Sequence, residues 1–304
     1  MDKNKRCGYV AILGRPNVGK STLLNVLLGQ KVSITSRKPQ TTRHQLLGIK
    51  TTKTSQILYV DTPGIHGDEP KAINRYMNRN AKSVIRDVDV IIFVVDRTQW
   101  SADDQLVAES ILKSAKVDTS IIIVVNKIDL LKSKNDLLPQ LSKIQGFMAD
   151  AKSVEIVPLS ATRGENIDSL ESLVEEALPV SPYYFPEDQI TDRSERFLVS
   201  EIIREKLMRN VGDEVPYSVT IQIERFARKG RTIHIDATIY VEREGQKIIL
   251  IGTDGDKLKR VGIDARLDIE RLLDCKVMLT TWVKVKRGWS NDDRALKSLG
   301  YDDV

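Results

Sequence analysis

The stretch Gly14-Arg15-Pro16-Asn17-Val18-Gly19-Lys20-Ser21 decides the fold of the first half of the chain. The apolar run Tyr9–Leu13 before it predicts a buried strand, and Thr22–Leu28 after it predicts a helix. This strand and helix are the context that the pattern G-x-x-x-x-G-K-[ST] requires. Glycines at both ends let backbone N–H groups point inward at the positive end of the helix, so the loop is predicted to bind phosphate groups.

Two side chains of the loop add to this predicted phosphate site. Lys20 brings a full positive charge toward the outer phosphates, and the Ser21 hydroxyl is placed to ligate Mg²⁺. The alternative is a glycine-rich turn that carries a solvated lysine. The predicted phosphate-binding residues are Gly14, Arg15, Pro16, Asn17, Val18, Gly19, Lys20, Ser21 and Thr22.

Length and composition allow one large domain or two ordinary ones in 304 residues. The two cysteines, Cys7 and Cys275, lie far apart, which argues against a disulfide framework and suits a reducing cytoplasm. We find no apolar run of membrane-spanning length and no signal-peptide core. The net charge is +5, but the residues from Ser181 onward hold 22 basic and 22 acidic side chains. Nucleic-acid binding must therefore be argued from local patches.

Strand and helix signals alternate through the first half, which predicts an α/β fold with a mostly parallel sheet covered by helices on both faces. Ligands of such sheets bind at the carboxyl ends of the strands. The predicted strands are Tyr9–Leu13, Leu46–Lys50, Gln56–Val60, Val90–Val95, Ser120–Val125 and Val154–Pro158. The predicted helices are Gly19–Leu28, Ile73–Arg86, Ala102–Ala115, Asp136–Asp150 and Ile167–Ala177.

Two segments after the first helix can complete a Mg²⁺ and phosphate site. In the polar segment Ile34–Arg43, Thr41 or Thr42 can join the Mg²⁺ shell, although a threonine in a polar loop is by itself a weak signal. The stretch Asp61-Thr62-Pro63-Gly64 follows a predicted strand. Its aspartate can hold Mg²⁺ through water and its glycine can bring an N–H to the γ-phosphate, although Asp-x-x-Gly alone also suits a plain turn. The predicted metal ligands are Ser21, Thr42 and Asp61.

The stretch Asn126-Lys127-Ile128-Asp129 indicates which base is bound. Guanine presents an N1–H beside a 2-amino group, and one carboxylate can accept from both, whereas adenine offers a bare N1 acceptor. Asp129 therefore selects guanine, Lys127 can lie along the base, and Asn126 can tie this loop to the phosphate loop. A backbone N–H at Ser160-Ala161 can reach the guanine O6 atom. A solvated turn is the alternative for the tetrapeptide alone.

Four elements follow predicted strands: the phosphate loop, Asp61–Gly64, Asn126–Asp129 and Ser160-Ala161. In this order they resemble the GTPase domain of the translation-factor-related class. Ras-like members have a glutamine after the Asp-x-x-Gly glycine, where this chain has Ile65. Isoleucine cannot orient water, so hydrolysis must use another device. The resemblance implies a K⁺ ion held by Asn17 in place of an arginine finger. The alternative is that Asn17 only braces the loop through its own backbone. Catalysis is assigned to Lys20, Thr42, Gly64 and Asn17, with Ile65 among the nucleotide-binding residues.

The second half has the predicted element order α-β-β-α-α-β and contains Gly252-Thr253-Asp254-Gly255. A Gly-x-x-Gly between helices in this order resembles a type II KH domain, in which the loop approaches single-stranded nucleic acid. An ordinary helix–helix turn is the alternative, and Asp254 departs from the basic residue common in such loops. Further predicted RNA contacts are Lys257, Lys259, Arg260, Lys284, Lys286 and Arg287, although any one basic run is more often a solvated face.

A GTPase domain followed by this KH arrangement resembles the Era family over nearly the whole chain. The predicted domains are a GTPase domain at 1–178, a linker at 179–195, a KH domain at 196–290 and a tail at 291–304. The resemblance implies binding near the 3′ end of 16S ribosomal RNA, assembly of the 30S subunit, GTP or GDP with Mg²⁺ as ligands, and a cytoplasmic monomer. Peripheral attachment to the inner membrane rests on resemblance alone. The rival functions are an ATP-using P-loop enzyme and an RNA-binding protein whose nucleotide site is only structural.

Replacing Asp129 by asparagine tests the base assignment. Asp129→Asn exchanges a carboxylate for an amide with one donor, which suits xanthine because xanthine has a carbonyl where guanine has its amino group. A hydrogen bond to a charged group contributes about 1.5–3 kcal/mol, so GTP binding should weaken by about ten- to 150-fold. Titration with GTP and with XTP measures this, and equal GTP affinity in both proteins would remove Asp129 from the site.

Overall fold

The computed structural model divides the chain into two compact units. It describes residues 5–36, 38, 41–64, 71–98, 100–149, 154–210 and 219–301. The first unit comprises Met1–Ser33, Thr42–Glu69 and Asn74–Asp192. The second comprises Ile34–Thr41, Pro70–Ile73 and Arg193–Val304. The main division, after Asp192, falls inside the predicted linker.

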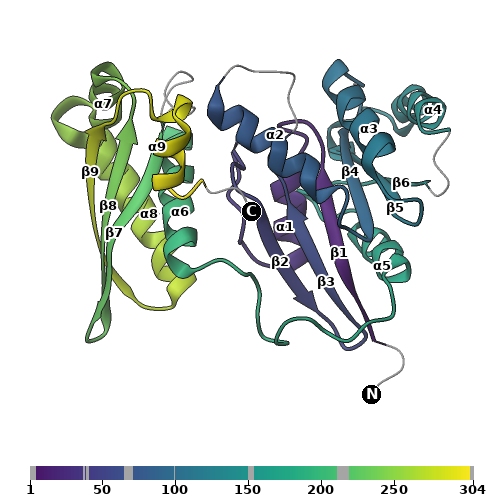
Figure 1. Cartoon of the computed structure of the whole chain (residues 1–304), viewed down its shortest axis with the longest axis horizontal. Helices are drawn as coiled ribbons and strands as arrows, with labels where there is room; N and C mark the ends of the chain where they lie inside the picture. Colours follow the sequence, from purple (N-terminus) through teal and green to yellow (C-terminus); the bar gives the residue numbers. More distant parts are fainter. Residues whose placement is uncertain are drawn as a thin grey trace. The chain divides into compact units, whose positions relative to one another are not determined.

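The first unit is built on a six-stranded sheet (Figure 1). Its spatial order is β2-β3-β1-β4-β5-β6. The β2–β3 pair is antiparallel because a tight turn joins the two strands, and the other pairs are parallel. The mostly parallel sheet is therefore confirmed. The strands are β1 (Arg6–Leu13), β2 (Leu46–Thr51), β3 (Ser55–Asp61), β4 (Val90–Asp96), β5 (Ser120–Asn126) and β6 (Val154–Pro158).

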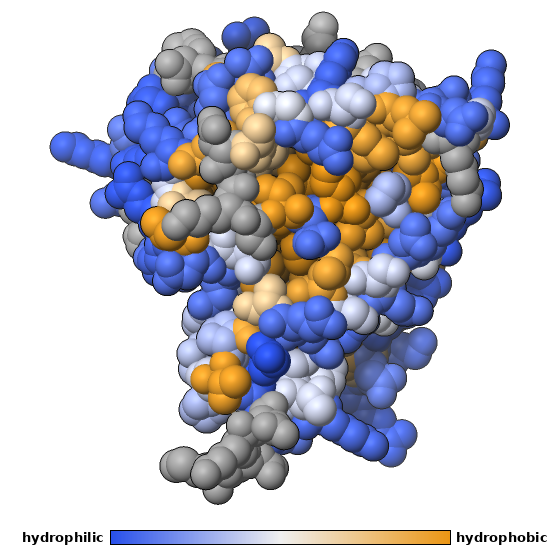
Figure 2. All heavy atoms as spheres, turned by 90° about the vertical axis from the view of Figure 1, so that its right-hand side faces the viewer, coloured by the Kyte–Doolittle hydropathy of each residue, from blue (hydrophilic) through white to orange (hydrophobic). Residues whose placement is uncertain are grey.

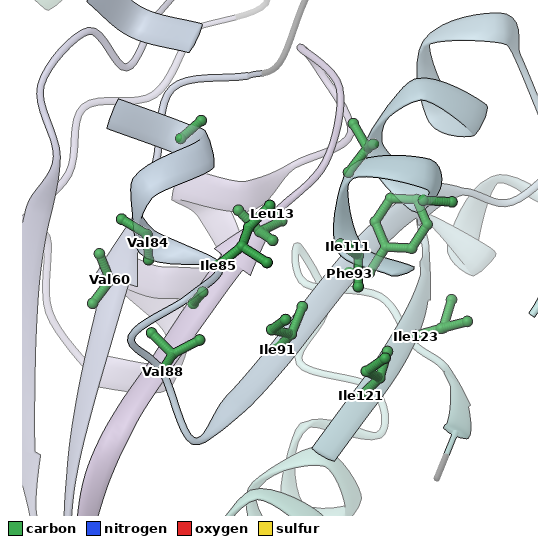
Figure 3. Packing of buried hydrophobic residues seen from close by; sticks show 14 of the residues in the cluster. Leu13, Val60, Val84, Ile85, Val88, Ile91, Phe93, Ile111, Ile121 and Ile123 are labelled. Atoms are coloured by element: carbon green, nitrogen blue, oxygen red, sulfur yellow. The ribbon is translucent and has the colours of Figure 1, made fainter. Parts of the chain in front are cut away.

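Helices cover this sheet, and the strands are apolar because both of their faces are buried. Figure 3 shows the side of the core where Ile91 and Phe93 of β4 pack with Ile85 and Ile111. A Ser101–Asp104 capping box starts α3, and Pro139 in the first turn of α4 is well placed because its missing N–H is not needed there. The helices are α1 (Lys20–Leu28), α2 (Ala72–Val84), α3 (Ala102–Ser114), α4 (Leu138–Phe147) and α5 (Ile167–Ala177).

Strand β6 ends the sheet and leaves hydrophobic side chains accessible. Val154 and Ile156 are only half-buried, and the nearby loop and helix expose Leu130 and Leu138. Figure 2 shows hydrophobic residues gathered in one area of this side of the molecule, with hydrophilic residues around it. Among the described helices, none combines the length and the apolar character that crossing a membrane requires.

Most of the predicted linker is bound to the first unit. The N–H of Cys7 in β1 donates to Pro179 O at 3.1 Å. The fully buried Gln56 of β3 then holds the next residues: its Oε1 accepts from the N–H groups of Tyr184 and Phe185 at 2.8 and 3.0 Å, and its Nε2 donates to Phe185 O at 2.9 Å. One buried side-chain amide therefore satisfies three backbone groups, and this part of the linker is bound to the sheet through β3.

The second unit has the predicted order α-β-β-α-α-β. Its last helix covers two segments, Asp256–Val261 and Ala265–Leu273, that were predicted as separate helices, and the helix before it is α7 (Glu244–Ile251). Helix α8 runs without interruption from Asp256 to Leu273, because neither Gly262 nor Asp264 breaks the backbone hydrogen bonding. Strand β8 pairs antiparallel with β7 and parallel with β9. The elements are α6 (Glu195–Asn210), β7 (Thr220–Lys229), β8 (Thr232–Val241), α7 (Glu244–Ile251), α8 and β9 (Lys276–Val285).

The separate tail predicted for 291–304 is corrected by the structure. Trp289 is fully buried, and Tyr301 is 3% exposed with its ring 6.0 Å from that of Trp289. Helix α9 (Asp293–Ser298) lies between them and is capped by Asp292, which accepts from two backbone N–H groups. The segment through Tyr301 therefore belongs to the core of the second unit, and burial of the two aromatic rings is the reason.

Removing the Trp289 ring should destabilise the second unit. Trp289→Ala deletes a fully buried indole, and such truncations cost about 3–5 kcal/mol. Urea denaturation followed by circular dichroism measures the effect, with Val117→Ala as control because Val117 is 71% exposed in the first unit. GTP affinity should be kept. An unchanged denaturation profile would show that the C-terminal segment does not contribute to the core.

Candidate nucleotide-binding site

The phosphate loop has a backbone that only glycine can adopt at two positions. Gly14 has φ +148° and a Cβ there would lie 2.4 Å from Val94 O. Gly19 has φ +104° and a Cβ would lie 2.4 Å from Asn126 Nδ2. Gly19 is also the N-cap of α1, and no side chain caps that helix. The first N–H groups of α1 are thus left for an anion.

Lys20 is buried and spans the loop. Its Nζ donates to Gly14 O at 2.9 Å and to Arg15 O at 3.0 Å. Burial lowers the pKa of Lys20 to about 8, and the nearby Asp61 carboxylate opposes this shift. A phosphate bound in the loop would favour the ammonium form. The predicted role of Lys20 as the cationic group of the site fits this placement.

Three hydroxyl groups converge on one oxygen of Asp61. Its Oδ2 accepts from Ser33 Oγ at 2.9 Å, Ser21 Oγ at 3.1 Å and Thr42 Oγ1 at 3.3 Å. Ser21 Oγ and Thr42 Oγ1 are themselves 2.8 Å apart. The structure thus brings together the three predicted metal ligands. Ser33 was missed because a serine between Val32 and Ile34 matches no motif. Thr41 instead donates to Lys38 O at 2.7 Å, so Thr42 is the better candidate.

These oxygens suit Mg²⁺. Asp61 is fully buried, and burial raises the pKa of its carboxyl above the usual value. Its Oδ1 is buried and has no hydrogen-bond partner within the described ranges. An unpaired carboxylate oxygen beside two hydroxyl groups is the hard donor set that Mg²⁺ takes, usually keeping several waters. Ser21, Thr42 and Asp61 are therefore able to hold the ion, directly or through water.

The segment after Asp61 lies against the phosphate loop. The Thr62 hydroxyl donates to Ile12 O at 3.0 Å and is buried. A Cβ at Gly64 would lie 2.9 Å from the Pro16 nitrogen, so this glycine allows the two loops to touch. Pro63 stands between Thr62 and Gly64 in the sequence. Ile65 is outside the described residues.

Asn126 joins the base-recognition loop to its neighbours. Its Nδ2 donates to Val18 O at 2.8 Å, which places the predicted tie to the phosphate loop. Its Oδ1 accepts from the Lys127 N–H at 2.7 Å and the Ala161 N–H at 3.1 Å. A backbone N–H at Ser160-Ala161 was predicted to reach guanine O6. The N–H of Ala161 is engaged by Asn126 here, and the contact with O6 stays a prediction.

Lys127 and Asp129 are each held by a second residue. Lys127 Nζ donates to Asn17 O at 2.7 Å and pairs with Asp96 at 3.0 Å. The Ser160 hydroxyl donates to Asp129 Oδ1 at 2.7 Å. Sequence reasoning assigned Ser160 only a backbone role, although a hydroxyl after the last strand was a visible signal. The hydroxyl fixes the carboxylate that is expected to read the base.

Two further features of the loop bear on catalysis. Arg15 Nε donates to the fully buried Asp104 at 3.0 Å, a pairing that 89 residues of separation hide from sequence reasoning. The Asn17 backbone is left-handed, with φ +64°. Within the described part of the chain its exposed side chain makes no hydrogen bond, so the bracing alternative finds no support.

The loop of the second unit repeats this helix-capping arrangement. Gly252 and Gly255 have φ +72° and +80°, and Gly255 is the N-cap of α8 without a side-chain cap. Asp254 also has a positive φ, +52°, which aspartate tolerates better than most residues. The departure at Asp254 therefore has a conformational reason. Thr253 lies between these positions in a short 3₁₀ turn.

The predicted basic RNA contacts are placed on two elements. Lys257, Lys259 and Arg260 are exposed on the first turns of α8. Lys284 and Arg287 are exposed at the end of β9 and just beyond it. Lys286 differs, because its Nζ donates to Ser298 Oγ at 3.2 Å and lies 5.7 Å from the centre of the Tyr240 ring. Their contacts with RNA stay predictions.

Comparison with known proteins covers both units. Residues 9–127 match the family model of a 50S ribosome-binding GTPase, and residues 214–290 match that of a KH domain. GTPase Era of Pseudomonas syringae pv. tomato is 58% identical over 299 residues, 98% of each chain. GTPase Era of Ectopseudomonas mendocina is 59% identical over 298 residues, again 98% of each chain.

Solved structures agree with these relatives. A tyrosine-to-alanine variant of Aquifex aeolicus Era bound to GDP and AlF₄⁻ superposes with a TM-score of 0.93 at 38% identity, covering 98% of this chain and 100% of the other. Era in complex with MgGDPNP and nucleotides 1506–1542 of 16S ribosomal RNA gives the same values. With its guanine-type recognition loop, its phosphate loop and its KH domain, the chain belongs to the Era family of GTPases.

Proposed function

We propose that this protein hydrolyses GTP to GDP and phosphate and binds the 3′ region of 16S ribosomal RNA during assembly of the 30S subunit. The observation that carries the first part is the convergence of Ser21 and Thr42 on Asp61 beside the phosphate loop. The second part is supported by the relative solved with nucleotides 1506–1542 of that RNA, whose fold this chain shares.

Hydrolysis of GTP requires positioning and charge neutralisation more than covalent chemistry. The N–H groups of the phosphate loop and Lys20 hold the β- and γ-phosphates, and Asp104 holds Arg15 at the loop. Asp129, fixed by Ser160, selects guanine, so the rival ATP-using enzyme is disfavoured. Mg²⁺, when bound by the Asp61 group of oxygens, neutralises phosphate charge.

Hydrolysis in this protein needs a device other than a glutamine. Isoleucine has no hydrogen-bonding group, so Ile65 cannot orient water. Asn17 presents an exposed amide on the phosphate loop, and the Lys127 Nζ fixes its backbone oxygen at 2.7 Å. A K⁺ ion bound by the Asn17 side-chain oxygen would neutralise charge on the phosphate oxygens in the transition state.

The second unit supplies the RNA contact through Gly252–Gly255. Its two glycines and the uncapped start of α8 leave backbone N–H groups for phosphate, and a Cβ at Gly255 would meet nothing within 4 Å. Lys257, Lys259 and Arg260 flank the loop. The cytoplasmic location, the peripheral attachment to the inner membrane and the monomeric state stay predictions.

Asn17→Ala tests the K⁺ device. GTP turnover of the unaltered protein should be at least about tenfold faster in potassium than in sodium at equal ionic strength, which corresponds to about 1.4 kcal/mol of barrier. The variant should lose this difference while it still binds GDP, because Gly14, Gly19 and Lys20 of the phosphate loop are unchanged. Equal rates in the two salts would refute activation by K⁺ and would indicate that a partner supplies the activating group.

Gly255→Asp tests the RNA loop, with Gly255→Asn as its matched control. Both side chains tolerate the left-handed backbone and meet open space, but only the aspartate places a negative charge where phosphate is expected. Filter binding to 16S nucleotides 1506–1542 should show an affinity at least about tenfold weaker for the aspartate variant than for the asparagine variant, since charge-assisted hydrogen bonds contribute about 1.5–3 kcal/mol. RNA-free GTP turnover should be unchanged in both. Equal RNA affinity in the two variants would exclude phosphate from this loop.

A further inference from the structure

The sheet of the second unit has one covered face and one open face. Helices α6 and α8 lie on one side of the three strands (Figure 1), where Ile235, Ile239 and Val283 form the core. Side chains alternate along a strand, so every second residue, out of step with these, points to the other face of the sheet. The strand pairing sets that face out in rows across the sheet: Lys229–Thr232–Lys276, Ala227–His234–Met278, Arg225–Asp236–Thr280, Gln222–Thr238–Trp282 and Thr220–Tyr240–Lys284.

The C-terminal segment covers one end of this face. Tyr301 and Thr220 are in hydrogen-bond contact through their hydroxyl groups at 3.3 Å, and Lys286 lies over the Tyr240 ring. Elsewhere on the same face of β9, the side chains of Met278 and Trp282 are 56% and 46% exposed. Two large hydrophobic residues on one face of one strand therefore remain accessible within the described structure.

A bulge in β7 changes the charge of the open face. The pairing register shifts between Ile223 and Arg225, so Arg225 rather than Glu224 lies opposite Asp236. A bulge inserts one residue and thereby redirects the side chains that follow it. Arg225 pairs with Asp236 at 4.0 Å. Without the shift, two carboxylates would have faced each other in that row.

The face therefore combines an exposed aromatic ring with a surplus of cations. Its exposed basic side chains are Arg225, Lys229, Lys276 and Lys284. Two acidic residues oppose them: Asp236 in the row of Arg225, and the bulge residue Glu224, whose charge adds to partial burial in raising the pKa of Tyr240. Bases of single-stranded RNA stack on aromatic side chains, and cations nearby attract the phosphates. The surplus of cations matches the regular negative charge of an RNA backbone, and the ring beside them offers a base a surface to stack on, so the combination favours RNA.

We propose that the open face of β7–β9 is a second RNA-binding surface, on which a single-stranded base stacks on Trp282 while Lys276 and Lys284 contact phosphates. This inference rests on the RNA binding proposed above for Gly252–Gly255, and it adds a contact on the face of the sheet opposite α6 and α8. The RNA is single-stranded, because a paired base has no accessible ring face.

Fluorine NMR of the full-length protein labelled with 5-fluorotryptophan tests the contact directly. The three tryptophans give separate probes: Trp282 on the open face, Trp289 buried in the same unit and Trp100 in the first unit. Titration with 16S nucleotides 1506–1542 should shift the Trp282 resonance, assigned with Trp282→Phe, and leave that of Trp289 nearly unmoved. A fully paired RNA of the same length should shift neither.

Binding measurements on variants complete the test. Trp282→Ala should weaken RNA binding by about five- to 150-fold, and Trp282→Phe by less, because phenylalanine keeps a ring for stacking. Lys276→Gln combined with Lys284→Gln should reduce the salt slope by about 1.4, because each phosphate of a single strand that a lysine neutralises adds about 0.7 to that slope. Lys113→Gln, exposed on α3 of the first unit, is the matched control.

The outcomes separate this proposal from the one it rests on. If the unaltered protein does not bind the RNA at all, the proposed function fails. If it binds but the Trp282 resonance stays in place and Trp282→Ala binds equally well, the second surface is overturned while the loop site stands. A Trp282 shift produced by an acidic polypeptide but not by RNA would also overturn it and assign the face to a protein partner.

Discussion

The side-chain amide of Asn126 is the contact on which the nucleotide site depends. It is 2% exposed and bonds at once to the phosphate loop, to its own loop and to the loop after β6. A buried polar group left without a partner costs about 1–3 kcal/mol, so these three loops cannot shift independently. Gly19 is a glycine partly because this amide occupies the space a side chain would need. The parts that bind phosphate and base are thereby fixed in one geometry.

The sequence was sufficient to predict most of this site because the fold places distant motifs together by rule. Strands in parallel end at one edge of the sheet, so loops that follow them meet there. Asp61, Asn126 and the pair at Ser160 could be assigned in this way. The prediction of Thr42 as metal ligand had no such rule behind it, because Thr41 beside it is chemically identical and only the contacts of the two distinguish them.

Features that depend on long-range pairing were missed, for a common physical reason. Gln56 bonds to backbone groups far along the chain, and Arg15 pairs with a residue 89 positions away. Trp289 is buried by residues outside its own segment. In each case the sequence around the residue carries no signal of its partner. The β7 bulge is similar, since a register shift follows from the partner strand. The two predicted helices that form α8 were separated by a local signal that proved too strong. Glycine has a low helix propensity, but α8 continues through Gly262.

The glycine-capped start of α8 also bears on how such loops vary. A contact made by backbone N–H groups does not depend on the side chain between the glycines. The residue at position 254 can therefore be one that suits the backbone conformation. Its left-handed φ favours aspartate over lysine or arginine. Recognition of this kind is hidden from any count of basic residues. The part of the chain from Ser181 onward, with 22 charges of each sign, can therefore carry a polyanion-binding element without a polyanion-binding composition.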